Sequence, residues 1–313
     1  MPELPEVESI RLSLLPRVTG RTIGTVLADT PGVLVDTDSS SLSGLTISGI
    51  RRRGKYLVFD LGQSGDGPVT AFLMVHLRMT GRLTLQPQSQ PVRPHTHVRL
   101  ELLSGCLEPV WLIFQDTRRF GRIWLIPAPD GAQWPGHLAR LGPEPLDPAF
   151  NAQVLKQQMA RHARLSVKAA LLDQTIIAGL GNIYADESLF RAGLYPARKV
   201  AGLQINEYTR LAHAITQVLA EAIACCGTTL RDYVDGWSRE GQFQNFLNVY
   251  GQAGKPCRRC TSLISKGKLA GRTTSWCPVC QPDPDAYDGT VQEQPSSVSV
   301  QAQSPANSHQ GRG

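Results

Sequence analysis

The sequence predicts an α+β protein of several domains, in which an N-terminal helix and a β-sandwich or barrel precede a helical domain and a small four-cysteine unit. Three observations support this prediction. Short segments of alternating polarity fill most of the chain before residue 127. Apolar residues at helical spacing replace them after residue 148. Four of the seven cysteines lie between residues 257 and 280, in a chain of 313 residues that has room for about two domains.

The first element is predicted to be a helix over residues 3–15, in which Val7, Ile10 and Leu14 recur at helical spacing and Pro5 falls in the permissive first turn. Five β-strands are predicted after it, at residues 45–50, 55–61, 71–77, 98–103 and 110–115. Several short strands at regular spacing indicate a β-sandwich or a barrel rather than alternating strand and helix units.

A segment rich in proline and glycine, residues 127–148, is predicted to be a linker. Beyond it, apolar spacing predicts a helix around residues 165–172 and another from about residue 208 that ends near Gly227. Between them, a glycine-rich turn precedes a short helix, for which Asn182 is the expected N-cap. The residues after 281 have few large apolar side chains and are predicted to form a disordered tail.

The composition is that of a folded, basic protein. Hydrophobic residues make up 41% and charged residues 19%, which excludes collagen, coiled coil and wholesale disorder. The formal net charge is +6, and because residues 282–313 contribute four acids and one base, the rest of the chain carries +9. A basic body indicates a polyanionic partner. No run approaches the roughly 18 apolar residues of a membrane span, and three early glutamates occupy the place of a signal core, so we expect a cytoplasmic protein without a membrane partner.

The cysteines between residues 257 and 280 form two Cys-x-x-Cys pairs, Cys257 with Cys260 and Cys277 with Cys280, separated by sixteen residues. This spacing predicts one zinc site, since each pair supplies two thiolates from a tight turn. Two unrelated reduced pairs, or iron in place of zinc, are the alternatives. A site with four protein ligands is structural rather than catalytic, and the basic residues around it indicate a nucleic-acid finger. The remaining cysteines are expected to be small buried side chains: Cys106, Cys225 and Cys226.

The N-terminus offers a candidate nucleophile. Pro2 follows the initiator methionine, and removal of that methionine would leave a secondary amine. An α-amino group has a pKa of about 7.7–8, so an unprotonated fraction exists near neutrality and can attack a carbonyl-like carbon. Glu3 stands beside it to donate or accept a proton. Taken alone, this opening favours a purely structural role over catalysis.

Motifs in a fixed order extend this hypothesis. They are Met-Pro-Glu-Leu-Pro-Glu-Val-Glu at 1–8, Arg-Gly-Lys-Tyr at 53–56, His-Leu-Arg-Met at 76–79, Asp-Thr-Arg-Arg-Phe-Gly at 116–121, Leu-Asp-Gln at 172–174, Ala-Gly-Leu-Gly-Asn-Ile-Tyr-Ala-Asp-Glu at 178–187 and Gly-Arg-Thr-Thr at 271–274. With the cysteine quartet, they resemble bacterial formamidopyrimidine-DNA glycosylase over residues 1 to about 281. The resemblance implies a bifunctional DNA glycosylase and AP lyase of base excision repair, which removes oxidised purines such as 8-oxoguanine and formamidopyrimidines.

The resemblance also implies a fold and a set of partners. The fold is an N-terminal helix on a two-layer β-sandwich (residues 1–135), a helix–two-turns–helix DNA-binding domain (145–240) and a zinc finger (247–281), followed by the tail (282–313). One structural zinc is implied. The partner is double-stranded damaged DNA, with no nucleotide cofactor, and the family expectation is a monomer associated with the bacterial nucleoid.

Catalytic roles carry over where positions match. Pro2 resembles the nucleophile that attacks the sugar anomeric carbon, and Glu3 resembles the acid that protonates the sugar ring oxygen. The resulting iminium permits β- and then δ-elimination of the flanking phosphates. Lys55 matches a lysine that supports this chemistry through a phosphate contact, although it could be one more charge on a solvated basic strand. Arg272 matches a phosphate-gripping arginine, a task to which its planar fork is suited.

Asn182 matches the partner of Arg272 in gripping the phosphates, and the glycine turn before it is expected to offer backbone N–H groups to a phosphate. His76 matches a further phosphate contact. Lys168 and Glu6 match positions near the lesion pocket, and Lys168 is placed among the DNA-binding residues. The alternatives are a plain helix cap for Asn182 and an ordinary strand histidine for His76.

Met79, Arg118 and Phe120 match a trio that fills the void when the damaged nucleotide is turned out of the duplex. Core positions are the alternative for Met79 and Phe120. Residues 228–241 match a polar, mobile lid over the flipped purine. The chain departs from the family pattern at Thr261, where a glycine is common after the second cysteine, and at Gln252, where a basic residue is common.

Two competing functions remain open. The related endonuclease VIII type prefers oxidised pyrimidines, but its opening usually has glycine in place of Leu4, and it lacks this lid and the Arg-Phe insertion pattern. A non-catalytic zinc protein that only binds damaged or bent DNA is the second alternative, against which the intact Pro2, Glu3 and Lys55 argue.

Overall fold

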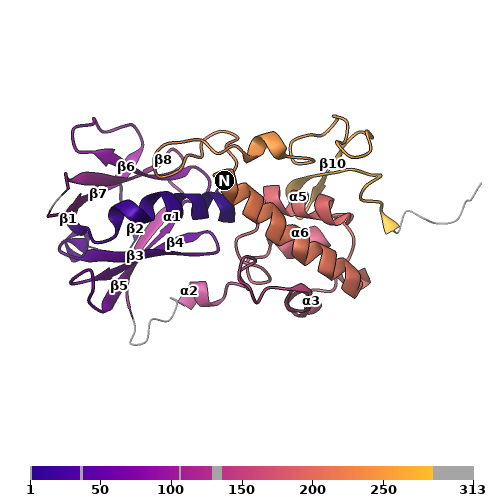
Figure 1. Cartoon of the computed structure of the whole chain (residues 1–313), viewed down its shortest axis with the longest axis horizontal. Coiled ribbons are helices and arrows are strands. Elements are labelled where there is room, and N and C mark those ends of the chain that lie inside the picture. The colour runs from indigo at the N-terminus through magenta and orange to yellow at the C-terminus, as the bar shows by residue number, and fades with distance from the viewer. Residues whose placement is uncertain (1, 36–37, 106, 129–135, 285–313) are drawn as a thin grey trace, which may run out of the picture.

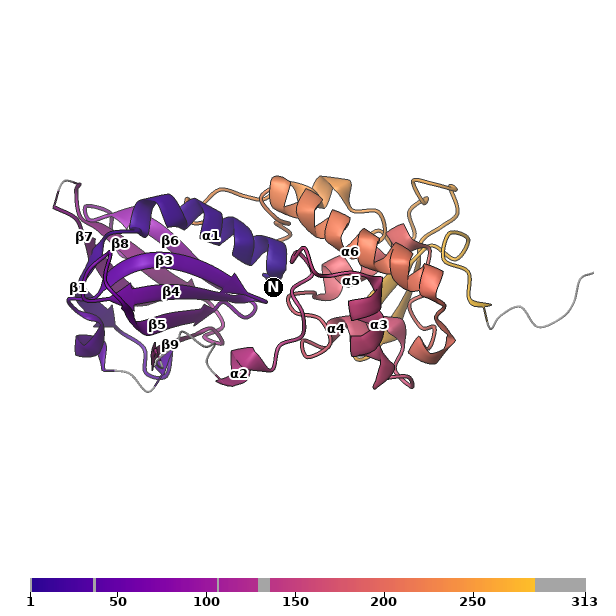
Figure 2. The same ribbon diagram turned by 60° about the horizontal axis from the view of Figure 1, so that its bottom comes forward.

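The computed structural model describes residues 2–35, 38–105, 107–128 and 136–284. The chain forms a β-rich lobe from its N-terminal part and a helical lobe from the rest (Figure 1). The N-terminus lies between the two lobes in both ribbon views (Figure 1 and Figure 2). The fold therefore presents the first residues of the chain at the junction of the lobes.

Helix α1 (Leu4–Val18) packs on the β-rich lobe through one apolar face. Val7, Ile10 and Leu14, the three residues that predicted it, are buried in the core. The helix continues past the predicted end at residue 15, because Val18 lies four residues after Leu14 and extends the buried stripe by one turn.

The described part of the chain contains nine strands in one sheet. They are β1 (Thr22–Ala28), β2 (Leu34–Val35), β3 (Thr46–Arg53), β4 (Tyr56–Gly62), β5 (Val69–His76), β6 (Gly81–Pro87), β7 (Thr96–Leu103), β8 (Val110–Asp116) and β9 (Arg122–Pro127). Their order is β2-β9-β5-β4-β3-β1-β7-β8-β6, and β1 pairs with both β3 and β7. Figure 2 shows β3, β4 and β5 in front of β6, β7 and β8, so the sheet folds into the two layers of the predicted sandwich.

The core of this lobe lies between the layers. Leu57, Phe59 and Leu61 of β4 share one buried cluster with Leu100 and Phe114 from the opposite layer. The five predicted strands are confirmed as β3, β4, β5, β7 and β8. The sequence analysis missed β1, β2, β6 and β9. Three of these have mixed burial and the fourth has only two residues, so alternating polarity is weak or too short to detect.

Helix α2 (Gly136–Ala139) packs on the β-rich lobe, where its Leu138 shares a buried cluster with Val58, Phe72 and Met74. The helical lobe contains α3 (Ala152–Ala160), α4 (Val167–Leu172), α5 (Asn182–Ala192) and α6 (Ile205–Ala224). Short 3₁₀ turns are η1 (Ser39–Leu42) in the first lobe and η2 (Val200–Gly202) and η3 (Phe243–Phe246) in the second. Tyr184, Leu211 and Ile215 belong to its core. The three predicted helices are confirmed as α4, α5 and α6. The sequence analysis missed α3, whose fully buried residues are Leu155 and Met159, which make a narrow apolar stripe.

Two local predictions are wrong. Gly181, not Asn182, is the N-cap residue of α5, and Asn182 is its first helical residue. Cys226 is exposed, with a left-handed backbone (φ 57°) just after the end of α6, while Cys225 is half-buried. A position where the chain leaves a helix in the left-handed region commonly lies at the surface. Cys106 lies outside the described residues.

The helical lobe ends in a β-hairpin of β10 (Ser265–Leu269) and β11 (Arg272–Trp276), next to the four cysteines. The sequence-based prediction of a disordered tail concerns residues 282–313, of which all beyond 284 lie outside the described residues.

Glu144, in the segment that joins the lobes, holds the β3–β4 turn. Its Oε2 accepts a hydrogen bond from Arg52 Nη1 at 2.6 Å, and its Oε1 accepts from Arg53 Nη1 at 3.0 Å and from Gly54 N at 2.6 Å. The Arg52 Nε also donates to Glu8 of α1 at 2.9 Å. These side chains are largely buried, so this network ties the linker, the hairpin and α1 together.

We expect Glu144→Ala to lower the free energy of unfolding by about 3 kcal/mol, because it removes the carboxylate partner of the largely buried Arg53 and leaves Arg52 paired only with Glu8. Urea unfolding would measure this. Glu221→Ala is the matched control: Glu221 pairs with Arg191 at 2.6 Å but its side chain is 51% exposed, and its loss should cost less than about 1 kcal/mol. Equal losses in the two variants would contradict a structural role for the Glu144 network.

Candidate active site

A cavity of about 490 Å³ opens at the junction of the lobes, and the N-terminal Pro2 forms part of its wall. Its other walls come from three places: the turns at 79–81 and 117–118, the segment 228–233, and the residues Ile183 and Tyr250. A larger cavity, of about 740 Å³, lies against the linker and contains none of the N-terminal residues. The cavity at Pro2 is therefore the candidate active site.

The Glu3 carboxylate caps the start of α5. It is buried, and it accepts hydrogen bonds from Gly181 N at 2.9 Å, Ile183 N at 3.1 Å and Tyr184 N at 3.4 Å. A carboxylate at a helix N-terminus is stabilised by unpaired N–H groups and by the helix dipole. A Cβ on Gly181 would fall 2.3 Å from the Glu3 Cδ, so only glycine permits this approach. The expectation that these N–H groups are open to a phosphate is wrong, because Glu3 occupies them.

Lys55 reaches the same turn from the β3–β4 hairpin. Its Nζ donates to the Leu180 carbonyl at 2.8 Å, one residue before the N–H that binds Glu3. Burial lowers the pKa of Lys55, while the Glu3 and Glu6 carboxylates oppose the shift. Glu3, the neighbour of Pro2 in the chain, and Lys55 thus converge on one backbone turn, although the two lie far apart in the sequence. The alternative of a solvated strand charge for Lys55 is wrong, since the residue is 8% exposed.

Glu6 connects α1 to both neighbouring segments. It is buried and accepts hydrogen bonds from Glu3 N at 2.8 Å, from the Tyr184 hydroxyl, and from Thr228 N at 2.8 Å. Burial, followed by the charge of Glu3, raises the pKa of Glu6 to about 7. A single titratable group therefore lies between the N-terminus, α5 and the start of the segment 228–241.

Met79, Arg118 and Phe120 come together at the cavity rim. Arg118 Nη1 lies 3.0 Å from Met79 Sδ, and the Arg118 guanidinium lies 4.8 Å from the centre of the Phe120 ring. Met79 and Phe120 are 39% and 49% exposed, so the core alternative is wrong for both. Two turns from different strand pairs therefore present one exposed apolar and cationic group.

Buried Asp116 organises both turns. Its carboxylate accepts hydrogen bonds from the Thr80 hydroxyl, from Arg118 N at 3.1 Å and from Gly121 N at 2.7 Å. One acid therefore sets the relative position of the Met79 turn and the turn that carries Arg118. His76 lies next to the first turn, where its Nδ1 accepts from Arg78 N at 3.0 Å. The neutral ring then carries its proton on Nε2, which is the donor that a phosphate would need.

Asn182 and the β11 strand meet across the helical lobe. Asn182 Nδ2 donates to the Thr273 carbonyl at 2.9 Å, directly after the exposed Arg272. Lys168, predicted to touch DNA, is instead fully buried; its Nζ pairs with Asp186 at 2.6 Å and donates to Thr273 O at 3.0 Å. A side chain with no exposed surface cannot reach a phosphate directly. We therefore assign Lys168 to holding the β11 strand against α5.

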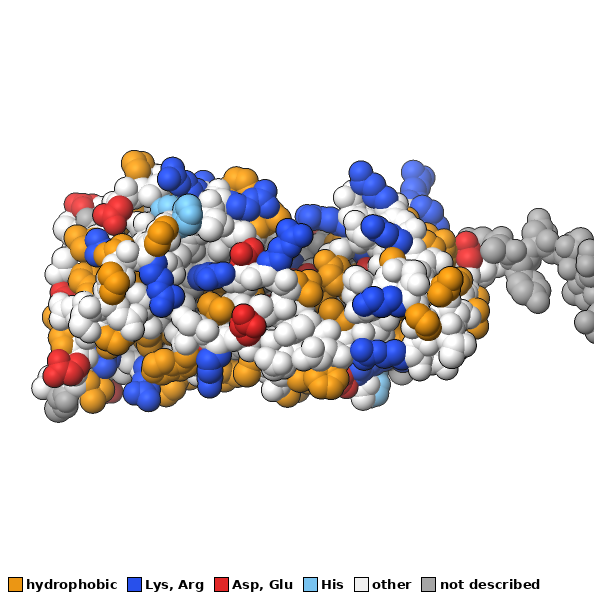
Figure 3. All heavy atoms as spheres, turned by 90° about the horizontal axis from the view of Figure 1, so that it is seen from above, with side chains coloured by type: hydrophobic (Ala, Val, Ile, Leu, Met, Phe, Trp, Pro, Cys, Tyr) orange, Lys and Arg blue, Asp and Glu red, His pale blue; other side chains and the backbone are white. Residues whose placement is uncertain are grey.

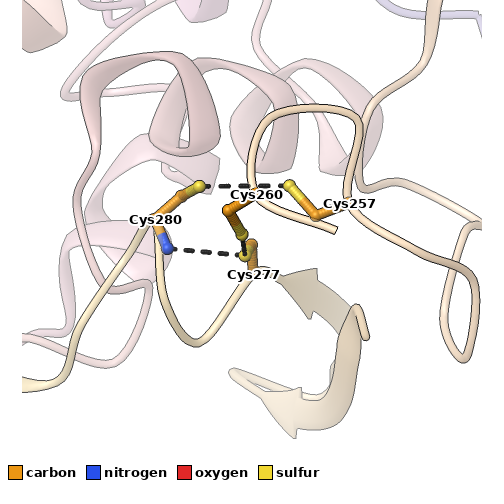
Figure 4. A group of neighbouring side chains, drawn as sticks. All are labelled: Cys257, Cys260, Cys277 and Cys280. Atoms are coloured by element: carbon orange, nitrogen blue, oxygen red, sulfur yellow. Dashed lines mark hydrogen bonds between the residues drawn. The ribbon is translucent and has the colours of Figure 1, made fainter. Parts of the chain in front are cut away.

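The four Sγ atoms of Cys257, Cys260, Cys277 and Cys280 lie within 4.8 Å of one another (Figure 4). Two of the separations are 3.9 Å, between Cys257 and Cys280, and 3.4 Å, between Cys260 and Cys277. Tetrahedral zinc with Zn–S bonds of about 2.3 Å requires sulfurs about 3.8 Å apart. The cluster therefore fits one structural zinc, as predicted.

Thr261, the departure after the second cysteine, has φ 65°. This left-handed conformation disfavours a β-branched residue, which explains in physical terms why glycine suits the position. Thr261 contacts two ligand residues through their backbone, since its hydroxyl donates to Cys260 O at 2.6 Å and its N–H donates to Cys257 O at 2.9 Å, but it replaces no ligand.

The face seen in Figure 3 carries Lys and Arg side chains on both lobes. Exposed cations include those of the finger and of the turns at the cavity rim: Arg78, Arg118, Arg119, Lys266, Lys268 and Arg272. Among the described residues, no helix combines the length and the apolar character needed to cross a bilayer.

Three family models match the chain: the formamidopyrimidine-DNA glycosylase N-terminal domain over residues 1–123, its H2TH domain over 141–234, and the zinc finger found in FPG and IleRS over 254–282. With the fold and the site, these matches define a DNA glycosylase of base excision repair. The chain belongs to the formamidopyrimidine-DNA glycosylase family, whose members also have AP lyase activity.

Individual relatives are similar to this protein over most of the chain. The formamidopyrimidine-DNA glycosylase of Desulfitobacterium hafniense is 46% identical over 285 residues, which cover 90% of this chain and all of the relative. That of Geobacillus kaustophilus is 42% identical over 286 residues, with 90% and 100% coverage. A Lactococcus lactis FPG variant in complex with Fapy-dG containing DNA matches with a TM-score of 0.81 and 36% identity, over 90% of this chain and 100% of that one.

The sequence analysis missed several residues that hold the site together. Asp116, Asp186 and Glu187 lie inside the quoted motifs, and Glu187 accepts hydrogen bonds from Val249 N and Tyr250 N at 2.9 Å each. Tyr250 lines the cavity. The sequence offered one signal for these residues, an acid inside an otherwise apolar or basic motif. The signal does not identify the groups that each acid binds, because those groups are distant in sequence.

We expect the free energy of unfolding of the wild type, minus that of Glu6→Gln, to fall as the pH rises. The folded pKa of Glu6, about 7, lies above its ordinary value of 4.5, so its contribution is most favourable at low pH and is lost as the pH approaches 7. Between pH 5.5 and 7 the difference should change by about 2 kcal/mol, at about 1.4 kcal/mol per pH unit.

Urea unfolding of both proteins at pH 5.5 and pH 8 would measure this difference, and other titrating groups cancel because both proteins contain them. The exposed Glu240→Gln serves as the matched control and should show no such trend. A constant difference between wild type and Glu6→Gln would refute the raised pKa.

Proposed function

We propose that this chain is a bifunctional DNA glycosylase and AP lyase that excises oxidised purines, such as 8-oxoguanine and formamidopyrimidines, through a Schiff base on Pro2. The observation that carries the proposal is the position of Pro2, which lines the cavity between the lobes while Glu3 and Lys55 contact the adjoining turn. Glu3, Lys55 and Arg272 complete the proposed catalytic set.

In the first step, the secondary amine of Pro2, exposed after removal of the first residue, attacks C1′ of the damaged nucleotide. The bond from C1′ to the base breaks, and the departing base takes a proton from water. The Glu3 carboxylate accepts the proton that the proline nitrogen loses and passes it to the sugar ring oxygen, so the ring opens and C1′ becomes an iminium carbon joined to the proline nitrogen. The start of α5 holds the Glu3 carboxyl group at Gly181 N and Ile183 N, and Ile183 lines the cavity together with Pro2.

In the second step, the iminium makes the proton at C2′ acidic. Loss of this proton expels the 3′ phosphate by β-elimination, and a further proton loss expels the 5′ phosphate by δ-elimination. Lys55 supports these steps from beside the leaving phosphate. Burial lowers the pKa of Lys55, which makes release of a proton from its Nζ easier.

The DNA backbone is held from the helical lobe. Arg272 is exposed on the finger hairpin, and Asn182 lies beside it through the bond to Thr273. His76 provides a further phosphate contact from the β-rich lobe. Met79, Arg118 and Phe120 fill the space that the extruded nucleotide leaves, since a base inside a duplex cannot reach the cavity.

The proposed division of labour follows the predicted domains: catalysis in residues 1–135, duplex binding in 145–240, and phosphate grip in the zinc finger at 247–281. The protein supplies the proposed nucleophile and acid, and the DNA supplies the electrophile, so we propose that no nucleotide cofactor is needed. We also propose that the protein is a monomer. Double-stranded DNA as substrate supports action at the bacterial nucleoid.

Oxidised pyrimidines are a second substrate class. One similar structure is a complex of wild-type Lactococcus lactis FPG with an oxidised pyrimidine containing DNA, at a TM-score of 0.79 and 35% identity. Excision from matched duplexes that carry 8-oxoguanine or thymine glycol would decide. We expect the 8-oxoguanine duplex to react faster, and a clear preference for thymine glycol would overturn the purine assignment.

Borohydride should trap the wild-type protein on 8-oxoguanine DNA, because it reduces the iminium to a stable amine. We expect Pro2→Gly to lower trapping and strand cleavage at least about tenfold while the Kd for the same duplex changes less than about threefold. Intact mass should first show that the initiator methionine is absent, since its retention blocks the amine. Equal losses of binding and trapping would make Pro2 structural, and no wild-type adduct would favour a protein that only binds DNA.

We expect Cys277→Ser to release zinc and to weaken binding of damaged and undamaged duplexes alike at least about tenfold, because the finger fixes Arg272. Zinc content and Kd are the measurements. Cys226→Ser, at an exposed cysteine outside the cluster, is the matched control and should keep both. Full binding without metal would show that the finger does not position Arg272.

A further inference from the structure

The lid segment, Thr228–Gly241, contains a hydrogen-bonded turn at residues 235–239, which we call the tip. Asp235 is buried, and its Oδ1 accepts hydrogen bonds from Trp237 N at 2.8 Å and Arg239 N at 2.9 Å. Asp235 N also donates to Arg239 O at 2.9 Å. These bonds close the tip into one tight turn.

The tip is docked on the β-rich lobe. Gly236 N donates to Ser13 Oγ of α1 at 3.0 Å, and Gly236 O accepts from Leu85 N of β6 at 3.0 Å. Strand β6 ends the strand order of the sheet, so the tip pairs with an edge. A Cβ on Gly236 would lie 2.6 Å from Leu14 Cδ2, which shows how closely the tip approaches α1.

Trp237 covers the docked tip. The Arg17 guanidinium lies 5.1 Å from the centre of its ring, within the range of a cation–π contact. Its side chain also borders a small, mostly apolar hollow of about 190 Å³ with Leu85, Pro87 and Val110. The residue is 43% exposed, so more than half of its surface is covered by α1 and the sheet edge.

The lid is thus fixed at both ends, and the cavity wall lies between them. At the neck, Gly241 N donates to Thr229 Oγ1 at 2.8 Å and Phe243 N donates to Gly227 O at 3.0 Å. Leu230, Arg231 and Asp232, between neck and tip, line the cavity together with Pro2. Tyr233 also holds this wall, because its hydroxyl donates to Cys226 O at 3.0 Å and its carbonyl accepts from Thr229 Oγ1 at 3.0 Å. Loss of the tip contact would therefore remove one of the anchors of the wall.

We propose that Trp237 is a positioning residue that latches the lid over the cavity before a base enters. The inference rests on the proposed function, because it concerns how that cavity receives a purine. A wall that is already in place lowers the ordering cost of binding the extruded base. An abasic site presents no base to cover, so its cleavage does not need the latch.

Single-turnover rates on duplexes with 8-oxoguanine or with an abasic site test the proposal. We expect Trp237→Ala to lower 8-oxoguanine excision at least about fivefold while abasic-site cleavage changes less than about twofold, and Trp237→Phe to keep most of the excision rate. Trp111→Ala is the matched control, because Trp111 forms a similar pair with Arg99 on the same sheet at 5.7 Å. It should leave both rates unchanged. Equal effects of Trp237→Ala on both duplexes, or none, would overturn the latch.

Limited proteolysis without DNA gives a readout that does not depend on catalysis. Trypsin should cut the lid after Arg231 or Arg239 faster in Trp237→Ala than in wild type or in Trp111→Ala. Unchanged lid cleavage would show that Trp237 does not hold the tip, whatever the enzymatic rates. A wild-type protein that processes neither duplex would instead refute the proposed function, while the proteolysis result would still decide the latch.

Discussion

The capping of α5 by the Glu3 carboxylate is the interaction on which the site depends. Three backbone N–H groups of one helix start bind the side chain of the third residue in the chain. Helix α1 begins at the next residue and packs into the β-rich lobe, so this bond joins the two lobes through the N-terminus. An N-terminal residue is usually free to move, and here the cap and the buried start of α1 hold Pro2 in place.

Carboxylates that bind backbone N–H groups recur around the cavity. Glu6 binds the first N–H of the lid, Asp116 joins the two rim turns, Glu144 holds the hairpin of Lys55, and Glu187 holds the segment that carries Tyr250. Each is a buried or, for Glu144, largely buried acid that accepts backbone N–H bonds. A protein with a basic surface for DNA thus turns these acids inward, where they organise turns and do not repel phosphate.

The zinc finger is stabilised in a different way, because its own buried apolar cluster is very small. Phe190, Val249 and Ile264 are its apolar members besides the cysteines. So few side chains cannot stabilise a domain, and a metal supplies the rest. Lys168 and Asn182 then connect the hairpin to α4 and α5 through Thr273, which brings Arg272 to the same side of the molecule as the helix start.

The sequence by itself determined the class of fold, five strands, four helices, the zinc ligands and the family, because periodicity, cysteine spacing and ordered motifs are local properties of the chain. Tertiary structure alone decided which groups meet. It placed Glu3, rather than a phosphate, on the α5 N–H groups and removed Lys168 from the surface. It also gave the N-cap position to Gly181 and docked Trp237 on α1. Each of these outcomes depends on burial and on contacts between residues far apart in sequence, which no local pattern encodes.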